Sequence, residues 1–375
     1  MNAFKPAPII INGRFLSKPN TGVTRVGREL LRALMELTQS DPRYRVEIRS
    51  APATWPAQGD TALSAPNNIA WRNGPSSMFS EQLNLPFQAR NAALLCFCNV
   101  FPFLTPRPIV WLHDAHVLDT PESYEHGYRL RHKILFRMAI IRRIPIVTVS
   151  NYSKSRLVHH GAEPDQITVI ASGGDHLQRV ESDPSALFHP RLQGRRFVLL
   201  IGSRAPHKNL PFAVEALSSR LDPDIMIAVA GLHQAGKYQC GKTMSGGERV
   251  IFLPQQSDGQ LRALYGAASA VVVPSLMEGF GLPVVEAMWE TTPLVLSDRT
   301  ALPEVGGDAA LYFDPTDADA IASAVSDALE PATATRLRTA ASRRRDQFTW
   351  KSAAERTLAL VESVDGLQSA EPRHN

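Results

Sequence analysis

Residues 269–288 read SAVVVPSLMEGFGLPVVEAM, an apolar run followed by a glycine-rich turn and a segment of helical period. Short apolar runs bounded by turn residues are typical of buried parallel strands. Pro283 suits the start of a helix, because its missing N–H would have no partner there. Gly279 and Gly281 have no Cβ, so backbone N–H groups of the turn can approach a ligand closely. The stretch therefore predicts a strand, a ligand-binding turn and a helix, in that order.

The same alternation of short apolar runs and longer helical segments extends over the whole chain. In the first half, the expected strands are 8–13, 93–99, 107–114, 144–150 and 166–172. In the second half, they are 197–203, 224–231, 249–255, 269–275 and 293–298. Strands that alternate with helices form parallel sheets that helices cover on both faces. The sequence thus predicts an α/β fold with two Rossmann-like parallel-sheet domains in series.

A polar, proline-bearing stretch separates the two series of strands. We place an N-terminal domain at 1–190, which includes a linker from about residue 173, and a C-terminal domain at 191–348. A helix at 349–366 is expected to pack back on the N-terminal domain, and 367–375 is expected to form a tail. Open parallel sheets bind ligands outside the carboxyl ends of their strands, so we expect the functional site between the two domains.

Length and composition agree with a two-domain globular protein. A chain of 375 residues exceeds the roughly 250 to 300 residues at which single cores stop growing. Apolar residues make up 44% and charged residues 20%, which argues against a disordered chain. The net charge of +4 is too small to indicate nucleic-acid binding, but it suits an anionic small substrate or an anionic membrane surface.

The cysteines and the hydropathy pattern indicate the compartment. Cys96, Cys98 and Cys240 form an odd set without metal-ligand spacing, so we expect reduced thiols. The start of the chain has too short an apolar run for a signal peptide, and no run approaches the ~18 apolar residues of a membrane span. We therefore expect a cytoplasmic protein, either in solution or at the inner face of the plasma membrane.

Two glutamates flank the predicted turn. Free amides and the positive end of a helix make a binding site for phosphate. We expect Glu286 in the first turn of the predicted helix. Phosphate would repel Glu286 if that side chain pointed at it, so we expect Glu286 to accept hydrogen bonds from ribose hydroxyls of a nucleotide. Glu278 would lie on the other side of the anion, beside a sugar attached to it. A lone glutamate near a helix start more often only favours the positive helix end; the combination with Gly279, Gly281 and Pro283 predicts a site.

The stretch EGFGLPVVE at 278–286 resembles the two glutamates, with seven residues between them, of the retaining glycosyltransferases of family 4. These enzymes have the GT-B architecture, in which two Rossmann-like domains face each other across a cleft. Further blocks resemble the family and occur in family order: TGVTRVGRELLRAL, WLHDAHVLDTPESY, IVTVSNYSKSRLV, IGSRAPHKNL and LPEVGGDAALYFDP. The resemblance covers nearly the whole chain and implies a GT-B glycosyltransferase.

For the donor diphosphate, the resemblance implies cations in the loop after the first strand of the C-terminal domain. The family typically has an Arg followed five residues later by a Lys. Here Lys208 matches the Lys, whereas Ser203 occupies the Arg position and Arg204 lies beside it. A departing nucleoside diphosphate gains negative charge that such cations stabilise. The alternative for Lys208 is a solvated loop lysine. This chemistry requires no metal, so we expect no metal ligands and no cofactor besides the donor substrate.

The resemblance also implies roles for residues outside this loop. His113 matches a family histidine beside the donor sugar, although a lone histidine is more often satisfied by its buried neighbours. We therefore assign catalytic roles to Glu278, His113 and Lys208. Asp114 and His116 are weaker candidates, because a carboxylate after a strand often caps the next helix. The donor contacts that the resemblance implies are Glu286, Arg204, Phe280, Gly281, Leu282, Gly22, Ser203 and Pro254.

The function implied by the resemblance is transfer of a hexose, of the mannose or glucose type, from a nucleotide-diphosphate sugar with retention of configuration. The implied acceptor is a saccharide or a lipid-linked oligosaccharide in cell-surface polysaccharide biosynthesis. The donor nucleotide, UDP or GDP, stays open. The alternatives are a hydrolytic nucleotide-sugar epimerase of the same fold and a catalytically inactive nucleotide-sugar-binding protein. A Rossmann oxidoreductase would need a Gly-x-Gly-x-x-Gly turn after the first strand, which residues 11–22 lack.

A basic segment and a single arginine each allow two interpretations. Residues 129–143 carry six Lys and Arg side chains among apolar residues near helical spacing. This segment is either an amphipathic face for anionic lipid or a helix that packs its apolar side on the N-terminal sheet, and the second interpretation is favoured. Arg25, at the start of a predicted helix, lies either in the cleft or on the surface.

Overall fold

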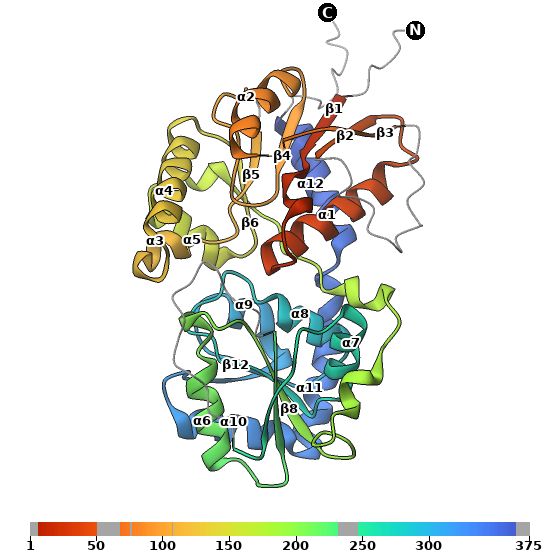
Figure 1. Cartoon of the computed structure of the whole chain (residues 1–375), viewed down its shortest axis with the longest axis vertical. Helices are drawn as coiled ribbons and strands as arrows, with labels where there is room; N and C mark the ends of the chain where they lie inside the picture. Colours follow the sequence, from red (N-terminus) through yellow and green to blue (C-terminus); the bar gives the residue numbers. More distant parts are fainter. Residues whose placement is uncertain (1–6, 51–67, 76, 107, 232–246, 365–375) are drawn as a thin grey trace, which may run out of the picture.

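The computed structural model describes residues 7–50, 68–75, 77–106, 108–231 and 247–364. Cys240 and the predicted tail at 367–375 lie outside these residues. The described chain forms two parallel sheets, one above the other in Figure 1, and helices cover both faces of each sheet. This is the predicted architecture of two Rossmann-like domains.

The N-terminal sheet has seven parallel strands in the order β3-β2-β1-β4-β5-β6-β7. They are β1 (Ala7–Asn12), β2 (Tyr44–Ser50), β3 (Ile69–Asn73), β4 (Ala93–Cys96), β5 (Pro108–Trp111), β6 (Ile146–Thr148) and β7 (Ile167–Val169). Apolar runs predict five of these strands but not β2 and β3. In β2 the buried residues alternate with Arg45, Glu47 and Arg49, so no continuous apolar run marks the strand.

The C-terminal sheet has six parallel strands in the order β10-β9-β8-β11-β12-β13. They are β8 (Phe197–Ile201), β9 (Met226–Ala230), β10 (Val250–Phe252), β11 (Ala270–Val273), β12 (Leu294–Ser297) and β13 (Ala310–Phe313). The first five were expected from the sequence, and β13 is the additional edge strand. Of its four residues, only Ala310 and Phe313 at the two ends are buried.

Twelve α-helices and eight short 3-10 helices connect the described strands. The α-helices are α1 (Gly22–Thr38), α2 (Met78–Gln88), α3 (His116–Asp119), α4 (His126–Ile141), α5 (Asn151–His159), α6 (Leu210–Arg220), α7 (Asp258–Ala267), α8 (Leu282–Trp289), α9 (Leu302–Gly306), α10 (Ala318–Leu329), α11 (Pro331–Arg344) and α12 (Trp350–Val364). The 3-10 helices are η1 (Gly13–Ser17), η2 (Pro121–Ser123), η3 (Pro164–Gln166), η4 (Asp175–Arg179), η5 (Pro184–Phe188), η6 (Pro206–Lys208), η7 (Gly307–Ala309) and η8 (Arg345–Gln347).

Each sheet has an apolar core on both faces. In the N-terminal domain, α1 and α12 bury their apolar sides on one face, and α2, α4 and α5 bury theirs on the other. In the C-terminal domain, α7, α8 and α9 lie on one face and α6 and α10 on the other. Parallel sheets buried in this way have strands that are apolar on both sides, which is why apolar runs identify most of them.

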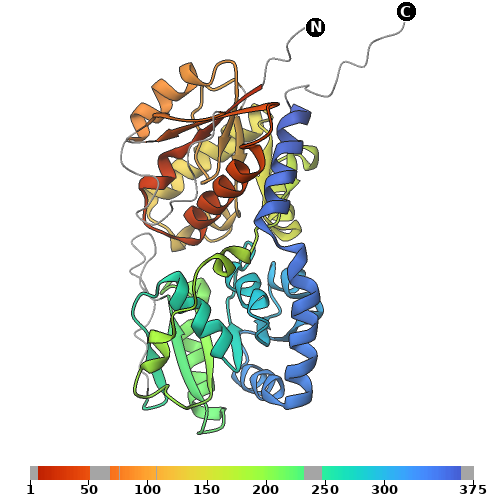
Figure 2. The same ribbon diagram turned by 90° about the vertical axis from the view of Figure 1, so that its right-hand side faces the viewer.

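The last helix crosses between the domains. Figure 2 shows α12 continuing from the C-terminal domain along the side of the N-terminal domain, next to α1. Trp350, Ala354 and Val361 are buried in the same apolar cluster as α1. The C-terminal end of the described chain therefore packs on the first domain.

The strand order determines which loops can form a site. In the C-terminal sheet β8 pairs with β11, so the loops that follow these two strands emerge side by side. The chain order reverses at this point, and open parallel sheets bind ligands at such a switch point. The loop after β8 carries Lys208, and the loop after β11 carries Glu278.

Candidate functional site

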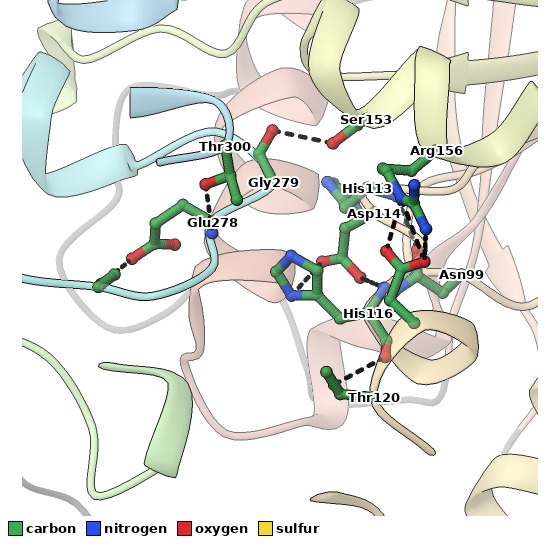
Figure 3. A network of polar contacts seen from close by, with 12 residues as sticks. Asn99, His113, Asp114, His116, Thr120, Ser153, Arg156, Glu278, Gly279 and Thr300 are labelled. Carbon is green, nitrogen blue, oxygen red and sulfur yellow. Dashed lines mark hydrogen bonds and ion pairs between the residues drawn. The ribbon is translucent and has the colours of Figure 1, made fainter. Parts of the chain in front are cut away.

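A partly buried ion pair joins the two loops at the switch point. Lys208 Nζ donates to Glu278 Oε1 over 2.6 Å, and Ser275 Oγ donates to the same oxygen over 2.7 Å. Glu278 is only 7% exposed. Its backbone N–H donates to Thr300 Oγ1 over 3.0 Å, as Figure 3 shows. Two predicted catalytic side chains, 70 residues apart in sequence, are thus in direct contact.

The carboxyl group of Glu278 is ionised in this setting. Burial by itself raises its pKa, but the Lys208 ammonium and the Ser275 hydroxyl lower it more, and the net pKa lies below the ordinary value. Glu278 therefore presents a fixed negative charge beside a cation at the carboxyl edge of the sheet.

Helix α8 begins directly after this pair. Gly281 is its N-cap residue in a left-handed conformation, with φ of 96°, and no side chain caps the helix. Leu282 and Pro283 are the first two helical residues, so Pro283 is second rather than first. The uncapped N-terminus directs backbone N–H groups and the positive helix end toward the loop, which suits an anion.

Glu286 lies one turn into α8, and not in its first turn as expected. It is 6% exposed. Tyr265 Oη donates to Glu286 Oε2 over 2.6 Å. His176 Nε2 lies 3.2 Å from Glu286 Oε1. His176 Nδ1 accepts a hydrogen bond from Trp350 Nε1, so the imidazole proton lies on Nε2 and faces the carboxylate.

The charge of Glu286 is also maintained by its partners. Burial raises its pKa, whereas His176, Arg25 and Tyr265 lower it, and the net pKa lies below the ordinary value. No sequence pattern assigns a role to Tyr265 or His176, because one lies within an ordinary amphipathic helix and the other in the polar linker.

His113 follows β5 and is held within the N-terminal domain. Its Nε2 donates to the Phe97 carbonyl oxygen over 2.7 Å, and its backbone N–H donates to Asn99 Oδ1 over 3.0 Å. Burial lowers the pKa of the imidazole, so the ring is neutral. The proton on Nε2 leaves Nδ1 as the nitrogen that can accept a hydrogen bond.

The Glu278 loop and the His113 loop meet at Gly279. The Gly279 carbonyl oxygen accepts hydrogen bonds from Ser150 Oγ over 2.6 Å and Ser153 Oγ over 2.9 Å, from the start of α5 in the other domain. A Cβ at this position would lie 2.9 Å from Asp114 Cβ and 3.0 Å from the His113 carbonyl oxygen. Figure 3 shows Ser153, His113 and Asp114 of the N-terminal domain near Gly279. Glycine is therefore required here for close approach of the domains.

Two further contacts connect the domains around this point. Arg25 of α1 forms a bidentate ion pair with Asp258 of α7, with an Nη1 to Oδ2 distance of 2.8 Å. Glu304 of α9 accepts hydrogen bonds from the first two N–H groups of α5, those of Asn151 over 2.8 Å and Tyr152 over 3.0 Å. The sequence left Arg25 between two interpretations and assigned no role to Glu304; in the structure both hold the domains together.

A second cluster of titratable groups lies on both sides of the domain boundary. The rings of His116 and His207 are 5.8 Å apart. Asp114 Oδ1 accepts a hydrogen bond from the His116 N–H, at the start of α3, over 3.0 Å, although Ala115 rather than Asp114 is the N-cap residue of that helix. Burial raises the pKa of Asp114, but His116 and other histidines lower it below its ordinary value. His207, which precedes Lys208, is not among the residues that the sequence singles out.

The other residues predicted to contact the donor differ in their burial and in their neighbours. The Phe280 ring is buried against Phe348 at 5.9 Å, and Leu282 packs against the apolar clusters of both domains. Ser203 Oγ accepts a weak hydrogen bond from the Ala205 N–H over 3.4 Å. The exposed ones are Arg204, Gly22 and Pro254. The structure thus brings Glu278, Lys208 and the His113 loop together, whereas no hydrogen bond or ion pair among the described residues joins Arg204, Gly22 or Pro254 to them.

Loss of the Glu304 contacts is expected to lower kcat/KM by roughly tenfold. Glu304→Ala removes charge-assisted hydrogen bonds to the start of α5, each worth roughly 1.5 to 3 kcal/mol at most. Steady-state kinetics and the radius of gyration from X-ray scattering measure the effect. The matched control is Glu215→Ala, an exposed glutamate of α6. Unchanged kinetics and radius in Glu304→Ala would contradict a role in holding the domains together.

His207 predicts a pH dependence of stability. Burial and Lys208 lower its pKa to about 4, from an ordinary value of 6.5. Between these pH values the unfolded chain binds a proton that the folded chain does not, so stability falls as pH falls from about 6.5 to about 4. In His207→Gln the free energy of unfolding is expected to fall by roughly 1 to 3 kcal/mol less over this pH range than in the wild type. Urea unfolding at several pH values measures it, with His126→Gln, an exposed histidine, as the control.

Comparisons with known proteins identify relatives of this chain. Residues 187–344 match the sequence model of the family described as "Glycosyl transferases group 1". The O-antigen chain mannosyltransferase B of Escherichia coli is 30% identical over 269 residues, which cover 68% of this chain and 70% of that protein. The O-antigen chain mannosyltransferase RfbU of Salmonella typhimurium is 25% identical over 333 residues, covering 84% and 90%.

Solved structures share the fold. The sucrose-phosphate synthase of Thermosynechococcus elongatus has a TM-score of 0.70 at 18% identity and covers 96% of this chain and 100% of that one. Anabaena Alr3699/HepE in complex with UDP-glucose has a TM-score of 0.68 at 18% identity and covers 94% and 99%. The part matched by the family contains Lys208, Glu278 and Glu286, whereas His113 lies outside it.

Proposed function

The chain belongs to the glycosyl transferases group 1, and on that premise we propose that it transfers a hexose of the mannose or glucose type from a nucleotide-diphosphate sugar, with retention of configuration. The proposed acceptor is a saccharide or a lipid-linked oligosaccharide of a cell-surface polysaccharide. The names of the two O-antigen mannosyltransferases support this polymer class and favour mannose. The UDP-glucose complex of HepE supports a nucleotide-sugar donor for this fold.

The observation that carries the proposal is the Lys208–Glu278 pair beside the uncapped start of α8. A cation and a helix N-terminus converge where a departing diphosphate would need stabilisation. In the structure the Lys208 ammonium is paired with the Glu278 carboxylate. When the donor binds, Lys208 would contact the phosphates, and the ionised Glu278 would then accept hydrogen bonds from the hydroxyls of the sugar.

The remaining residues have assignable roles in this reaction. The carboxylate of Glu286, held ionised by Tyr265 and His176, would accept hydrogen bonds from the ribose. His113 would contact the sugar from the other domain through its free Nδ1. The bond between the sugar and the diphosphate breaks through an oxocarbenium-like centre. The acceptor hydroxyl would attack from the face that the diphosphate leaves and pass its proton to the departing diphosphate oxygen, which gives retention.

Four measurements test the proposal. A thermal-shift panel of UDP- and GDP-sugars identifies the donor, and NMR of the product reports its anomeric configuration. Free nucleoside diphosphate that accumulates only when acceptor is supplied supports a transferase. Release without acceptor would instead favour the hydrolytic epimerase, and binding without any turnover would favour an inactive binding protein. Activity that disappears in EDTA and returns with a divalent metal would refute the expectation that no metal is required.

A further inference from the structure

One face of the N-terminal domain exposes most of the large apolar side chains found on the surface. Eleven such side chains are exposed among the described residues. Seven of them lie on α2, on α4 and in the loop at 101–106, and four are scattered over the rest of the described chain. The seven are Phe79, Leu83, Phe87, Leu104, Leu130, Ile134 and Ile141. We call this surface the α2–α4 face. Single exposed apolar residues are ordinary, but such a gathering marks an interaction surface.

Helix α2 contributes an apolar stripe that points away from the sheet. Phe79, Leu83 and Phe87 are spaced by four residues, so they lie along one side of the helix. They are 76%, 52% and 80% exposed. The opposite side of the helix buries Leu85 against the sheet. Folding of the domain therefore does not account for these three side chains.

Helix α4 has the same arrangement and lies on the same face of the sheet. Leu135 and Phe136 are buried in the cluster that also contains Leu85 of α2. Leu130, Ile134 and Ile141, spaced by four and seven residues, are exposed. The structure thus confirms that the 129–143 helix packs on the sheet, and it shows that a second apolar side remains uncovered.

The loop at 101–106 connects the two helices into one surface. Gln82 of α2 donates to the Phe101 carbonyl and accepts from the Phe103 N–H. Arg142, which ends α4, donates to the carbonyl oxygens of Phe103 and Thr105. Leu104, 75% exposed, lies between these anchors. The apolar side chains of α2 and α4 are therefore held on either side of a fixed loop.

The charge of this face is positive. Helix α4 contains Arg129, Arg131, Lys133 and Arg137 and no acidic residue. Lys133 and Arg137 are exposed beside the apolar residues of α4. The one acidic residue of α2, Glu81, is 1% exposed and is neutralised by Arg14. Basic side chains around an apolar stripe favour binding to a partner whose surface has an anionic layer over an apolar interior.

We propose that the α2–α4 face docks on the surface of an anionic lipid membrane, with α2 and α4 lying in the interface. The inference rests on the proposed function, since a lipid-linked acceptor is presented at such a surface. The apolar stripes enter the acyl boundary, and the basic side chains contact lipid phosphates. No described helix is long and apolar enough to cross a membrane, so contact along the surface is the form of membrane binding that these helices allow.

Vesicle sedimentation tests the docking face. Wild-type chain is expected to sediment with vesicles rich in phosphatidylglycerol and to stay in the supernatant with pure phosphatidylcholine, because the basic residues need an anionic partner. Phe79→Ser/Phe87→Ser is expected to lower the partition coefficient by at least about tenfold, since two aromatic side chains no longer enter the acyl region. Lys133→Glu/Arg137→Glu is expected to lower it by a similar factor.

The control is Phe188→Ser, which removes a 64% exposed phenylalanine from the linker segment η5. It is expected to sediment as the wild type does. Equal binding of all variants, or no binding to anionic vesicles, overturns the proposal, and so does self-association of the wild type that Phe79→Ser/Phe87→Ser abolishes. Turnover of a water-soluble acceptor is expected to be unchanged in these variants. If the wild type does not turn over the water-soluble acceptor, that result refutes the proposed function independently of membrane binding.

Discussion

Replacement of Lys208 with alanine is expected to lower kcat roughly 10²- to 10³-fold, the usual effect of removing one preorganised group that stabilises developing charge. Lys208 Nζ lies 2.6 Å from Glu278 beside the start of α8, where the diphosphate is expected to leave. Because the negative charge grows as the bond breaks, the loss should appear in kcat more than in KM. Initial rates at saturating donor and acceptor measure it.

The same substitution also destabilises the fold, and this effect has to be separated from catalysis. Lys208→Ala leaves Glu278 buried without its cation, which costs roughly 3 to 5 kcal/mol when a buried pair is broken. The double variant Lys208→Met/Glu278→Gln removes both charges at similar volume and should regain stability without regaining activity. Lys351→Ala, 72% exposed on α12, is the control. Wild-type kcat in Lys208→Ala would show that the lysine only neutralises Glu278.

The sequence predicts the members of this site better than their contacts. Glu278 is singled out by its glycine-rich turn and Lys208 by the family resemblance, but their ion pair depends on β8 lying next to β11. No local pattern specifies which strands of a parallel sheet are neighbours, because the order follows from how the whole sheet assembles. Glu286 lies just past the first turn because α8 begins one residue before Pro283, at Leu282 behind a left-handed glycine.

The contacts between domains are the part that sequence reasoning does not reach. Ser150, Ser153 and Glu304 have ordinary local explanations as helix-capping or surface residues. Their partners lie more than 120 residues away in the chain. Such pairs follow from the relative placement of two independently packed domains. Local periodicity carries no information on that placement, whereas it does identify the buried strands on which the fold depends.

Gly279→Ala is expected to lower kcat/KM by roughly 10²-fold through separation of the domains, since a shift of about 1 Å in a catalytic geometry has an effect of that order. Gly279 is not among the glycines with positive φ, so alanine can adopt its backbone conformation without strain. The new Cβ would instead meet Asp114 and the His113 carbonyl of the facing domain at 2.9 and 3.0 Å. Both are parts of folded structure and cannot yield without moving the domain.

Donor binding distinguishes this effect from damage to the C-terminal domain. Lys208 and Glu286 both lie in that domain, so Gly279→Ala should bind the nucleotide with nearly wild-type affinity in calorimetric titration. Gly281→Ala is the informative contrast, because a φ of 96° and a Leu302 side chain at 2.8 Å place its strain inside the C-terminal domain. Gly266→Ala, whose Cβ would be in ordinary contact at 3.7 Å, is the neutral control. Wild-type kcat/KM in Gly279→Ala would mean that catalysis does not require the contact between this loop and α5.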